Sequence, residues 1–469
     1  MTDPPQDWTE SNEPEAEAVA EDDYYLDPEL ISEVSEALAA GEVNRVQELI
    51  EPLHAADLAD LLEYLDKDER GLAVEALWSF IDSEVLAYLD VAVREEVIDL
   101  IGPRQLAVAL SEMDSDDAVE VFEDLDEEVQ HRILSKLPQA YRHLLEESLS
   151  YPEDSAGRLM QREMVVIPSA WSVGETIDHM RTSEDLPDDF YDLFIVNPKH
   201  RPIGAVPLSR VLRTRRPVRL TEIMDTEFKL IPLTMDQEDV AYTFRQYGLV
   251  SAPVVDDAGR LVGVITVDDV VYVIDEEAED DLMKLGGVGE STDLYSAFWD
   301  TVRTRSTWLV VNLGTAILAS MVIGLFESTI ERLVALAVLM PIVASMGGNA
   351  GTQTLTVAVR ALAMKDLTSA NASRFVRKEL MVGALNGVLF ALVTGAIAWA
   401  WFGQPEIGLV IGAAMIVNMF VAGLSGTLIP IGLERVGVDP AIASSVFLTT
   451  VTDVIGFFAF LGLAAAFLL

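Results

Sequence analysis

The sequence predicts a multidomain membrane protein with an all-α superhelical N-terminal domain, a repeated α/β module, an amphipathic connecting helix and a five-helix transmembrane domain. Three observations lead to this fold class. Acidic charge is concentrated before Ser291, in the part of the chain that holds 68 of the 78 acidic and 22 of the 31 basic residues. An α/β segment occurs twice in the middle of the chain. Five apolar segments follow, and each is long enough to span a bilayer as a helix.

The formal charge of −47 restricts the partners of this protein. Nucleic acid is a poor partner, because binding it requires a basic surface. Cations are the natural partners of so acidic a chain, although the same charge would also keep a protein soluble or suit a salty habitat. The chain contains no cysteine, which excludes disulfides and thiolate metal sites.

The first 156 residues are expected to form an acidic tail and a helical N-domain. Residues 1–28 predict a disordered tail, because they are rich in Pro and Glu and lack the basic and apolar segments of a signal peptide. In residues 29–156, short amphipathic stretches alternate with Gly, Pro or Asp breaks, which predicts a stack of short helices. Asp116, Asp117 and Glu120 lie in its densest acidic turn. They are candidate metal ligands, or else a solvated helix face with an Asp N-cap.

The α/β repeat consists of two pairs of matching segments. Residues 164–181 match 228–245, and residues 192–212 match 251–271. Pro168 and Pro232 stand at equivalent positions. Each copy has the pattern strand, helix, strand, turn, strand, helix, so we expect two similar domains that pack against each other.

Both copies resemble CBS domains, and as a pair, at residues 157–218 and 219–281, they resemble a Bateman module. In CBS domains, a Thr or Ser followed three positions later by an Asp holds an adenosine ribose. Thr266 and Asp269 match that pattern in the second copy, which implies a nucleotide site with ATP as the candidate ligand. The first copy has no Asp at the equivalent place.

An acidic run and an amphipathic segment connect this module to the membrane spans. The run is IDEEAEDDLMKLGG, whose charges repel one another unless water or cations neutralise them. We expect a connecting helix, the plug helix, over residues 282–305, lying along the cytoplasmic membrane surface. Its apolar residues are Leu294, Tyr295, Phe298 and Trp299, and its basic residues are Arg303 and Arg305.

Residues 306–469 are expected to form the transmembrane domain. Only helices fit, because a closed barrel would need short alternating strands. Basic residues precede the first span and fill the loop between the second and third. The positive-inside rule therefore places the N-terminal half in the cytoplasm and the C-terminus outside. The predicted spans are residues 306–326, 333–359, 379–402, 407–430 and 441–468.

The second span contains the least typical membrane sequence, PIVASMGGNAGTQTLT. Pro341, Gly347, Gly348 and Gly351 are expected to break or loosen the helix, and the freed carbonyls would be cation ligands beside Asn349. The alternative is a seam of small residues that packs against another helix. Single asparagines in the third and fourth spans, Asn386 and Asn418, are weaker signals, because the simpler interpretation of a single Asn is a polar bond across helices.

The fifth span contains one ionisable residue, Asp453. A carboxylate near mid-membrane costs roughly 3 kcal/mol, so it is a functional-site hypothesis by default. Thr449, Thr450 and Thr452 add hydroxyl oxygens beside it, and together these groups suit a hard cation. The alternative is a buried Asp that bonds to a neighbouring helix.

The order of these parts, with the motifs GGNAGTQ and TTVTDVIG, resembles the MgtE family of magnesium channels. The resemblance implies a homodimer in the bacterial inner membrane, with membrane lipid around it and a pore between the two subunits. In that pore, Asp453 of each chain would hold a hydrated Mg²⁺, which matches the reluctance of Mg²⁺ to lose its water. The pore candidates are Asp453, Asn349, Gly348, Thr449, Thr450 and Thr452.

The resemblance also implies that cytosolic Mg²⁺ closes the pore by bridging acids of the N-domain, the CBS pair and the connecting helix. The candidate sensor acids are Asp236, Glu238, Asp269, Glu277, Asp280 and Asp281, with Asp116, Asp117 and Glu120 in the N-domain. Gly248, Tyr272 and Ala297 stand where the family pattern has acids, which leaves open a weaker, displaced or partly lost sensor.

Three rival functions remain at this point. The first is a transporter of Co²⁺, Mn²⁺ or another divalent ion, or an ion-coupled carrier, although spans without Cys or His do not suit soft metals. The second is an intramembrane enzyme that uses Asp453, which would need a second carboxylate or a nucleophile and base at the same depth. The third is a nucleotide sensor with a passive anchor, which would not need polar groups within a span.

Overall fold

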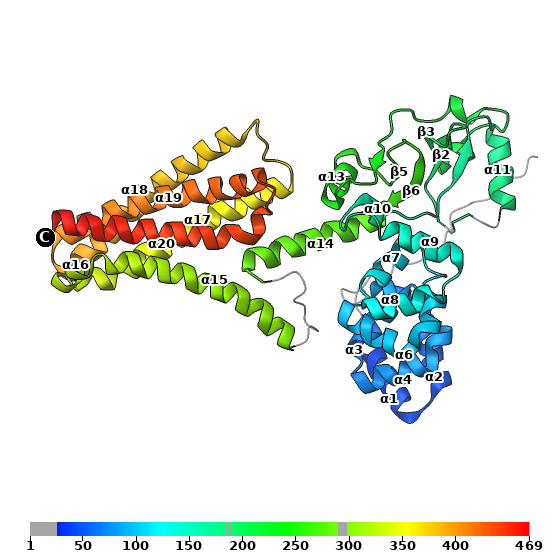
Figure 1. The fold of residues 1–469 in the computed structure, drawn as a ribbon, viewed down its shortest axis with the longest axis horizontal. Helices are drawn as coiled ribbons and strands as arrows, with labels where there is room; N and C mark the ends of the chain where they lie inside the picture. The colour runs from blue at the N-terminus through cyan, green and yellow to red at the C-terminus, as the bar shows by residue number, and fades with distance from the viewer. Residues whose placement is uncertain (1–25, 184–185, 188, 289–297, 469) are drawn as a thin grey trace, which may run out of the picture. The chain divides into compact units, whose positions relative to one another are not determined.

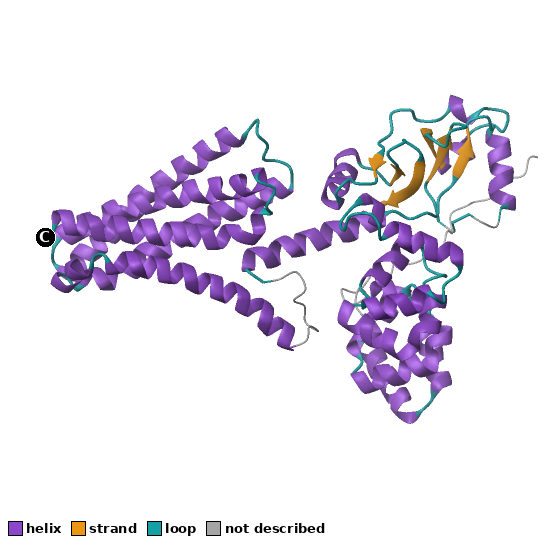
Figure 2. Cartoon of the chain, viewed as in Figure 1, coloured by secondary structure: helices purple, strands orange, loops and turns teal. Residues whose placement is uncertain are grey.

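The computed structural model describes residues 26–183, 186–187, 189–288 and 298–468. The chain divides into two compact units, one of Met1–Thr234 with Pro253–Val264, and one of Met235–Ala252 with Ile265–Leu469. Strands occur only in the middle of the described chain, and the parts before and after them are helical (Figure 2). The expected fold class is confirmed: a helical N-domain, a duplicated α/β module and five long apolar helices.

The N-domain is a stack of short helices around one apolar core. Asp side chains start several of these helices, as in the capping box of Asp66 and Glu69 and the Asp90 N-cap. Leu61, Val97 and Phe122 lie in the fully buried core, and the acidic residues lie mostly outside it. The helices are α1 (Pro28–Ala40), α2 (Val43–Ile50), α3 (Ala55–Tyr64), α4 (Lys67–Leu77), α5 (Val85–Tyr88), α6 (Val91–Ala109), α7 (Ser115–Glu123), α8 (Glu127–Leu134) and α9 (Gln139–Ser148).

The two α/β copies form two three-stranded sheets, in the orders β1-β2-β3 and β4-β5-β6. In the first sheet β1 pairs with β2 in parallel and β2 pairs with β3 antiparallel, and in the second β4 pairs with β5 in parallel. This repetition confirms the internal duplication. The elements are α10 (Ala156–Leu159), β1 (Val166–Pro168), α11 (Val173–Thr182), β2 (Asp192–Val196), β3 (Pro202–Pro207), α12 (Leu208–Arg213), β4 (Ile231–Pro232), α13 (Gln237–Tyr247), β5 (Ser251–Val255), β6 (Leu261–Thr266) and α14 (Val267–Gly286).

The expected connecting helix over 282–305 is not one separate element in the described part of the chain. Its first residues are the last turn of α14, which extends the second CBS copy without a break and contains the acidic run. Its last residues begin α15, the first membrane helix. Leu294, Tyr295 and Ala297 lie outside the described residues.

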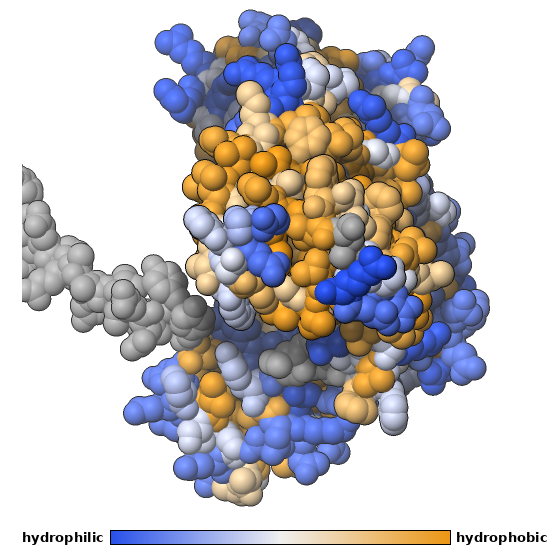
Figure 3. All heavy atoms as spheres, turned by 90° about the vertical axis from the view of Figure 1, so that its left-hand side faces the viewer, coloured by the Kyte–Doolittle hydropathy of each residue, from blue (hydrophilic) through white to orange (hydrophobic). Residues whose placement is uncertain are grey.

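Five helices are long and apolar enough to cross a membrane, which confirms the expected number of spans among the described residues. They are α15 (Phe298–Gly324), α17 (Ala335–Ala363), α18 (Ala372–Phe402), α19 (Pro405–Arg435) and α20 (Pro440–Phe467), with the short α16 (Glu327–Arg332) between the first two. The central helix is α19, which packs against α17, α18 and α20 (Figure 1). Many large apolar side chains of these helices are exposed, and apolar residues also cover much of the face shown in Figure 3, as a lipid environment requires.

The expected break in the second span is wrong, because α17 is one continuous helix from Ala335 to Ala363. Gly347 and Gly351 serve helix packing instead. A Cβ atom added to Gly347 would lie 2.1 Å from Nδ2 of Asn418, and one added to Gly351 would lie 2.7 Å from Cδ1 of Leu448. In apolar surroundings a helix keeps its backbone hydrogen bonds, since no water replaces them, and small residues allow neighbouring helices to approach closely.

Candidate functional site

The candidate pore residues lie on two helices that pack together, α17 and α20. On α20, Asp453 is half-buried and Thr449 lies four residues before it, so both occupy one helix face. Within the described residues, the Asp453 carboxylate accepts no hydrogen bond and forms no ion pair. A carboxylate at this depth without a partner in its own chain is available to a ligand from outside the chain.

The three threonines around Asp453 differ in how they are placed. Thr449 and Thr450 are half-buried, and their hydroxyls donate to the carbonyl oxygens of Ser445 and Val446 at 3.1 and 2.6 Å. Their oxygen lone pairs remain free to accept hydrogen bonds from the water of a hydrated ion. Thr452 is completely buried, which sets it apart from the half-buried face of Asp453.

A polar stripe, defined here as Ser345, Asn349, Thr352 and Thr356, runs along one side of α17. Its members are three or four residues apart, so they share a helix face, and all four are exposed. Nδ2 of Asn349 lies 3.4 Å from Oγ of Ser345, and the space beside Gly348 is open. An exposed polar row within a span is unfavourable against lipid, so another protein surface or water must cover it.

Asn418 of α19 is completely buried between Gly347 of α17 and Gly456 of α20. Its Nδ2 donates a hydrogen bond of 2.7 Å to the backbone oxygen of Val343. The simpler interpretation of this residue, a polar bond across helices, is therefore confirmed. Asn418 fixes the packing of the helices that carry the candidate pore residues.

Glu379 is a buried acid in the membrane domain that the sequence analysis missed. Its side chain lies at the start of α18, and Thr354 of α17 donates to Oε2 at 3.2 Å. Nζ of Lys378 lies 3.8 Å from its Oε1. Its place directly after Lys378 could have indicated an ion pair. The predicted third span, 379–402, instead treats Glu379 only as the first residue of the apolar segment.

The acidic helix α13 meets the loop between α17 and α18 through Lys365. Nζ of Lys365 lies 2.9 Å from Oδ1 of Asp239 and 3.7 Å from Oε1 of Glu238. Burial raises the pKa of Glu238 to about 7, since Lys365 only partly offsets it and the charge of Glu277 adds to it. Arg245 of α13 also donates to the backbone oxygen of Met364 at 3.3 Å.

A second lysine, Lys284, links α14 to the start of α20. Its Nζ lies 3.2 Å from Oδ2 of Asp439 and 3.5 Å from Oδ2 of Asp280. Asp439 is also the N-cap of α20, where it accepts a hydrogen bond from the backbone N–H of Ala441 at 2.7 Å. Burial and the nearby charge of Asp439 raise the pKa of Asp281 to about 6.

The other candidate sensor acids take part in local contacts. Asp236 caps α13 and accepts from the backbone N–H of Glu238 at 3.0 Å. Glu277 accepts from Nε2 of Gln237 at 2.9 Å. No group of three or more acids or histidines in the described chain is close enough to form a ready metal site. Binding of Mg²⁺ here would therefore need the acids to move closer together.

Thr266 and Asp269, the candidate nucleotide residues, form the capping box of α14. The Thr266 hydroxyl donates to Oδ2 of Asp269 at 2.7 Å, and its backbone N–H donates to the same oxygen at 3.4 Å. This local role accounts for both residues without a ligand. Nucleotide binding stays a prediction.

Two of the positions that depart from the family pattern lie in the described chain. Gly248 ends α13 in the left-handed conformation, with φ of 62°, which disfavours an acid there. Tyr272 lies exposed on α14.

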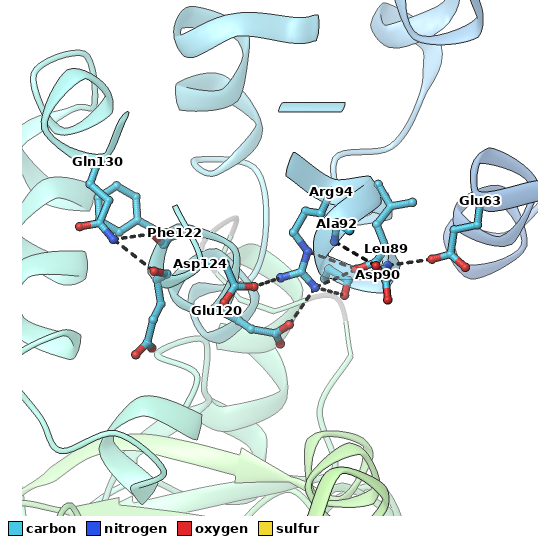
Figure 4. Close-up of polar contacts among 11 residues, drawn as sticks. Glu63, Leu89, Asp90, Ala92, Arg94, Glu120, Phe122, Asp124 and Gln130 are labelled. Atoms are coloured by element: carbon cyan, nitrogen blue, oxygen red, sulfur yellow. Dashed lines mark hydrogen bonds and ion pairs between the residues drawn. The ribbon is translucent and has the colours of Figure 1, made fainter. Parts of the chain in front are cut away.

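In the N-domain, Glu120 belongs to an ion-pair network around the buried Arg94 (Figure 4). The guanidinium of Arg94 lies 3.0 Å from Oε1 of Glu120 and 2.9 Å from Oδ2 of Asp124, and it also donates to the backbone oxygen of Leu89. Burial raises the pKa of Asp124, and Arg94 opposes that shift. Asp116 accepts from the backbone N–H of Asp117 at 3.1 Å in the first turn of α7.

Comparisons with known proteins cover nearly the whole chain. A family described as MgtE divalent cation transporters matches residues 340–463, the MgtE intracellular N domain matches 53–154, and the CBS domain matches 220–276. The magnesium transporter MgtE of Thermus thermophilus is 32% identical over 94% of this chain and 98% of its own length. The magnesium transporter MgtE of Bacillus subtilis is 26% identical over the same shares of both chains.

Among solved structures, the cytosolic domain of the Mg²⁺ channel MgtE in complex with ATP matches 52% of this chain and 99% of its own length. Its sequence identity is 29% and its TM-score is 0.49.

Proposed function

Because this chain belongs to the MgtE family of magnesium transporters, we propose that it is a Mg²⁺-selective channel for Mg²⁺ uptake, formed by two copies and closed by cytosolic Mg²⁺. Family membership makes the protein a multi-pass magnesium transporter with a cytosolic N-domain, and not an enzyme. The buried Glu379 is a second carboxylate in the membrane domain, which the rival enzyme would require, but the family decides against that rival.

The single observation behind the proposed pore is that an isolated chain leaves the half-buried carboxylate of Asp453 unpaired and the polar stripe of α17 exposed. An unpaired carboxylate in lipid costs roughly 3 kcal/mol, so a second copy that covers this face would relieve a penalty in both chains. Two Asp453 carboxylates would then face each other across a polar channel. Thr449 and Thr450 of α20, and Gly348 and Asn349 of α17, would contribute further oxygen atoms to it.

The chemistry of this site favours Mg²⁺ in its hydrated form. Mg²⁺ releases water slowly and is usually held through one or two carboxylates and several retained waters. The membrane half contains neither Cys nor His, which soft transition metals prefer. Hydroxyl and amide groups beside a pair of carboxylates can hydrogen-bond the retained water.

We further propose that Mg²⁺ closes the channel by neutralising the acids of α13 and α14. Lys365 and Lys284 already attach these helices to the membrane domain, at Asp239 and Asp439. The remaining acids that face the same region, Glu238 and Asp281, have pKa values raised by burial, so an additional cation would bind there favourably. Asp116 and Asp117 of the N-domain, Asp236, Glu277, Asp280 and ATP at Thr266 and Asp269 remain predicted contributors.

The proposed orientation follows from the basic loops. Lys365, Arg374, Arg377 and Lys378 lie between α17 and α18 or in the first turns of α18, so this side is assigned to the cytoplasm and the C-terminus to the exterior. The membrane is the bacterial inner membrane, and the partner is a second copy.

Uptake of Mg²⁺ into liposomes tests the pore. We expect Asp453→Ala to lower Mg²⁺ flux at least tenfold, while Glu434→Gln, which removes an exposed acid at the C-terminal end of α19, leaves flux unchanged. Normal Mg²⁺ flux through the Asp453→Ala protein would refute the pore assignment. Equal flux of Mn²⁺ or Co²⁺ in the wild-type protein would replace the Mg²⁺-selective function by a broader divalent one.

A further inference from the structure

A cavity of about 960 Å³ lies at the start of α18, beside the loop that follows α17. Its lining is of two kinds. Arg374, Arg377 and Lys378 contribute positive charge, and Leu367, Phe375 and Met381 contribute apolar surface. None of these residues belongs to the candidate pore or to the candidate sensor.

The charge of this cavity is positive and is only partly balanced by the chain. Asp366 is the one acid in the lining, against three cations. Nε of Arg377 donates to the backbone oxygen of Ser373 at 3.2 Å, which leaves its charge uncompensated. In the described part of the chain, neither Arg374 nor Arg377 forms an ion pair, and Lys378 lies 3.8 Å from Glu379. The site therefore suits an anion that approaches from outside the chain.

The apolar part of the site continues along the outer face of α18. Glu379 and Gly383 face the neighbouring helices, whereas Met381 and Leu385 are 68% and 72% exposed. A molecule with its anionic end among the arginines would thus have apolar protein surface below it, toward the membrane interior. This combination matches a phospholipid, which joins a phosphate to acyl chains.

We propose that this cavity binds the headgroup of an anionic phospholipid from the cytoplasmic leaflet. Arg374 and Arg377 hold the phosphate, Lys378 adds a further cation, and the acyl chains lie along Met381 and Leu385. The excess of positive charge selects anionic over zwitterionic headgroups. The assignment to the cytoplasmic leaflet rests on the orientation given with the proposed function.

Occupation of this cavity would also affect the cytosolic acids. Asp366 and Leu367 directly follow Lys365, whose amino group pairs with Asp239 and Glu238 of α13. A lipid held between Leu367 and Arg374 would restrict the short loop that positions this lysine. The same membrane composition that fills the site would therefore favour the attachment of α13.

Native mass spectrometry of the full-length protein in detergent, titrated with phosphatidylglycerol or phosphatidylcholine, tests the proposal. The triple variant Arg374→Gln/Arg377→Gln/Lys378→Gln should bind phosphatidylglycerol roughly tenfold to a hundredfold more weakly than the wild type, with little change for phosphatidylcholine. The matched control is Arg303→Gln/Arg305→Gln/Arg435→Gln, which removes three cations on the same proposed side but outside the cavity.

Each result decides the question. Retained binding by the cavity variant, or an equal loss in both triple variants, would overturn the site in favour of diffuse electrostatic attraction. Displacement of phosphatidylglycerol by millimolar inorganic phosphate would identify a free-anion site instead of a lipid site. Mg²⁺ flux in purely zwitterionic liposomes separates this inference from the proposed function, because the cavity variant should still conduct there.

Discussion

Asp453, in the middle of membrane helix α20, differs in its surroundings from the acids of the N-domain, of α13 and of the N-cap of α20. Asp453 has no partner among the described residues, whereas Glu120, Asp239 and Asp439 each face an arginine or lysine of the same chain. An acid that its own chain already neutralises serves packing or attachment between elements. For Asp453, which the described chain leaves unpaired at membrane depth, we propose that the counter-charge is the transported ion.

The largest expected effect is in the N-domain, where a buried arginine is surrounded by acids. Arg94→Ala should lower the free energy of unfolding of this domain by about 3 kcal/mol, because it removes a buried guanidinium and leaves the backbone oxygens of Ala87 and Leu89 without their donors. The measurement is denaturant unfolding followed for the N-domain. The control is Arg45→Ala, since the exposed pair of Arg45 with Glu33 should contribute less than about 1 kcal/mol. Equal losses in both variants would contradict the distinction between the buried Arg94 and the exposed Arg45.

Gly347 and Gly348 are adjacent on α17, but Gly347 faces a neighbouring helix and Gly348 faces open space. Gly347→Ala should destabilise the membrane domain by about 1–3 kcal/mol, because its new Cβ would meet Asn418. Gly348→Ala should not destabilise it, because the space around Gly348 is open and Ala favours a helix. Thermal unfolding of the detergent-solubilised protein measures both. A destabilised Gly348→Ala protein would mean that a second chain occupies that space closely.

Lys365 is expected to have a smaller and regulatory effect. Its pairs with Asp239 and Glu238 are partly exposed, so they should contribute about 1 kcal/mol or less. Lys365→Gln should shift the Mg²⁺ concentration that protects residues 235–290 from protease by a few-fold. Lys199→Gln, a charge loss in an exposed turn of the first CBS copy, should leave that midpoint unchanged. An unaltered midpoint in Lys365→Gln would remove the lysine from the sensor.

The smallest expected effect is a pH dependence that arises from Glu238. Its pKa in the folded protein, about 7, exceeds the ordinary value of 4.5, so the folded state holds the proton more tightly than the unfolded state. This contribution to stability is present below pH 4.5 and is lost as the pH rises to about 7. Protons also compete with Mg²⁺, so the protective Mg²⁺ concentration should be higher at pH 6 than at pH 8.

Glu238→Gln is the matched test of that dependence. It keeps the shape of the side chain and removes its titration, so the Mg²⁺ midpoint should depend less on pH than in the wild type. A pH dependence of wild-type size in Glu238→Gln would assign the effect to another group, of which Asp281 is the first to examine because its pKa is about 6.

The sequence predicted the fold well because its signals are local and periodic. Five apolar segments and a duplicated strand and helix pattern do not depend on contacts between distant residues. The break expected at Gly347 was wrong because the role of this glycine depends on a contact between distant residues. Whether a glycine loosens a helix or packs against another depends on Asn418, which is 71 positions away in the sequence.

The sites were predictable only in part. Asp453 was found because charge is rare within a span. Glu379 was missed because it stands where the apolar run begins, and the pairing of Glu120 with Arg94 joins residues 26 positions apart, which no helix spacing indicates. The pairs of Lys284 and Lys365 could not be predicted, since only the packing of α14 and of the loop after α17 reveals the acids they meet.

The polar stripe of α17 and Asp453 of α20, if shared between two chains, predict how a mutant gene acts beside the wild-type gene. When two chains each supply one Asp453 to a shared pore, a defective chain also disables the intact copy with which it assembles. Expression of Asp453→Ala beside the wild-type gene should therefore reduce Mg²⁺ uptake below that of a cell with the wild-type gene alone. A chain that conducted by itself would show no such dominance.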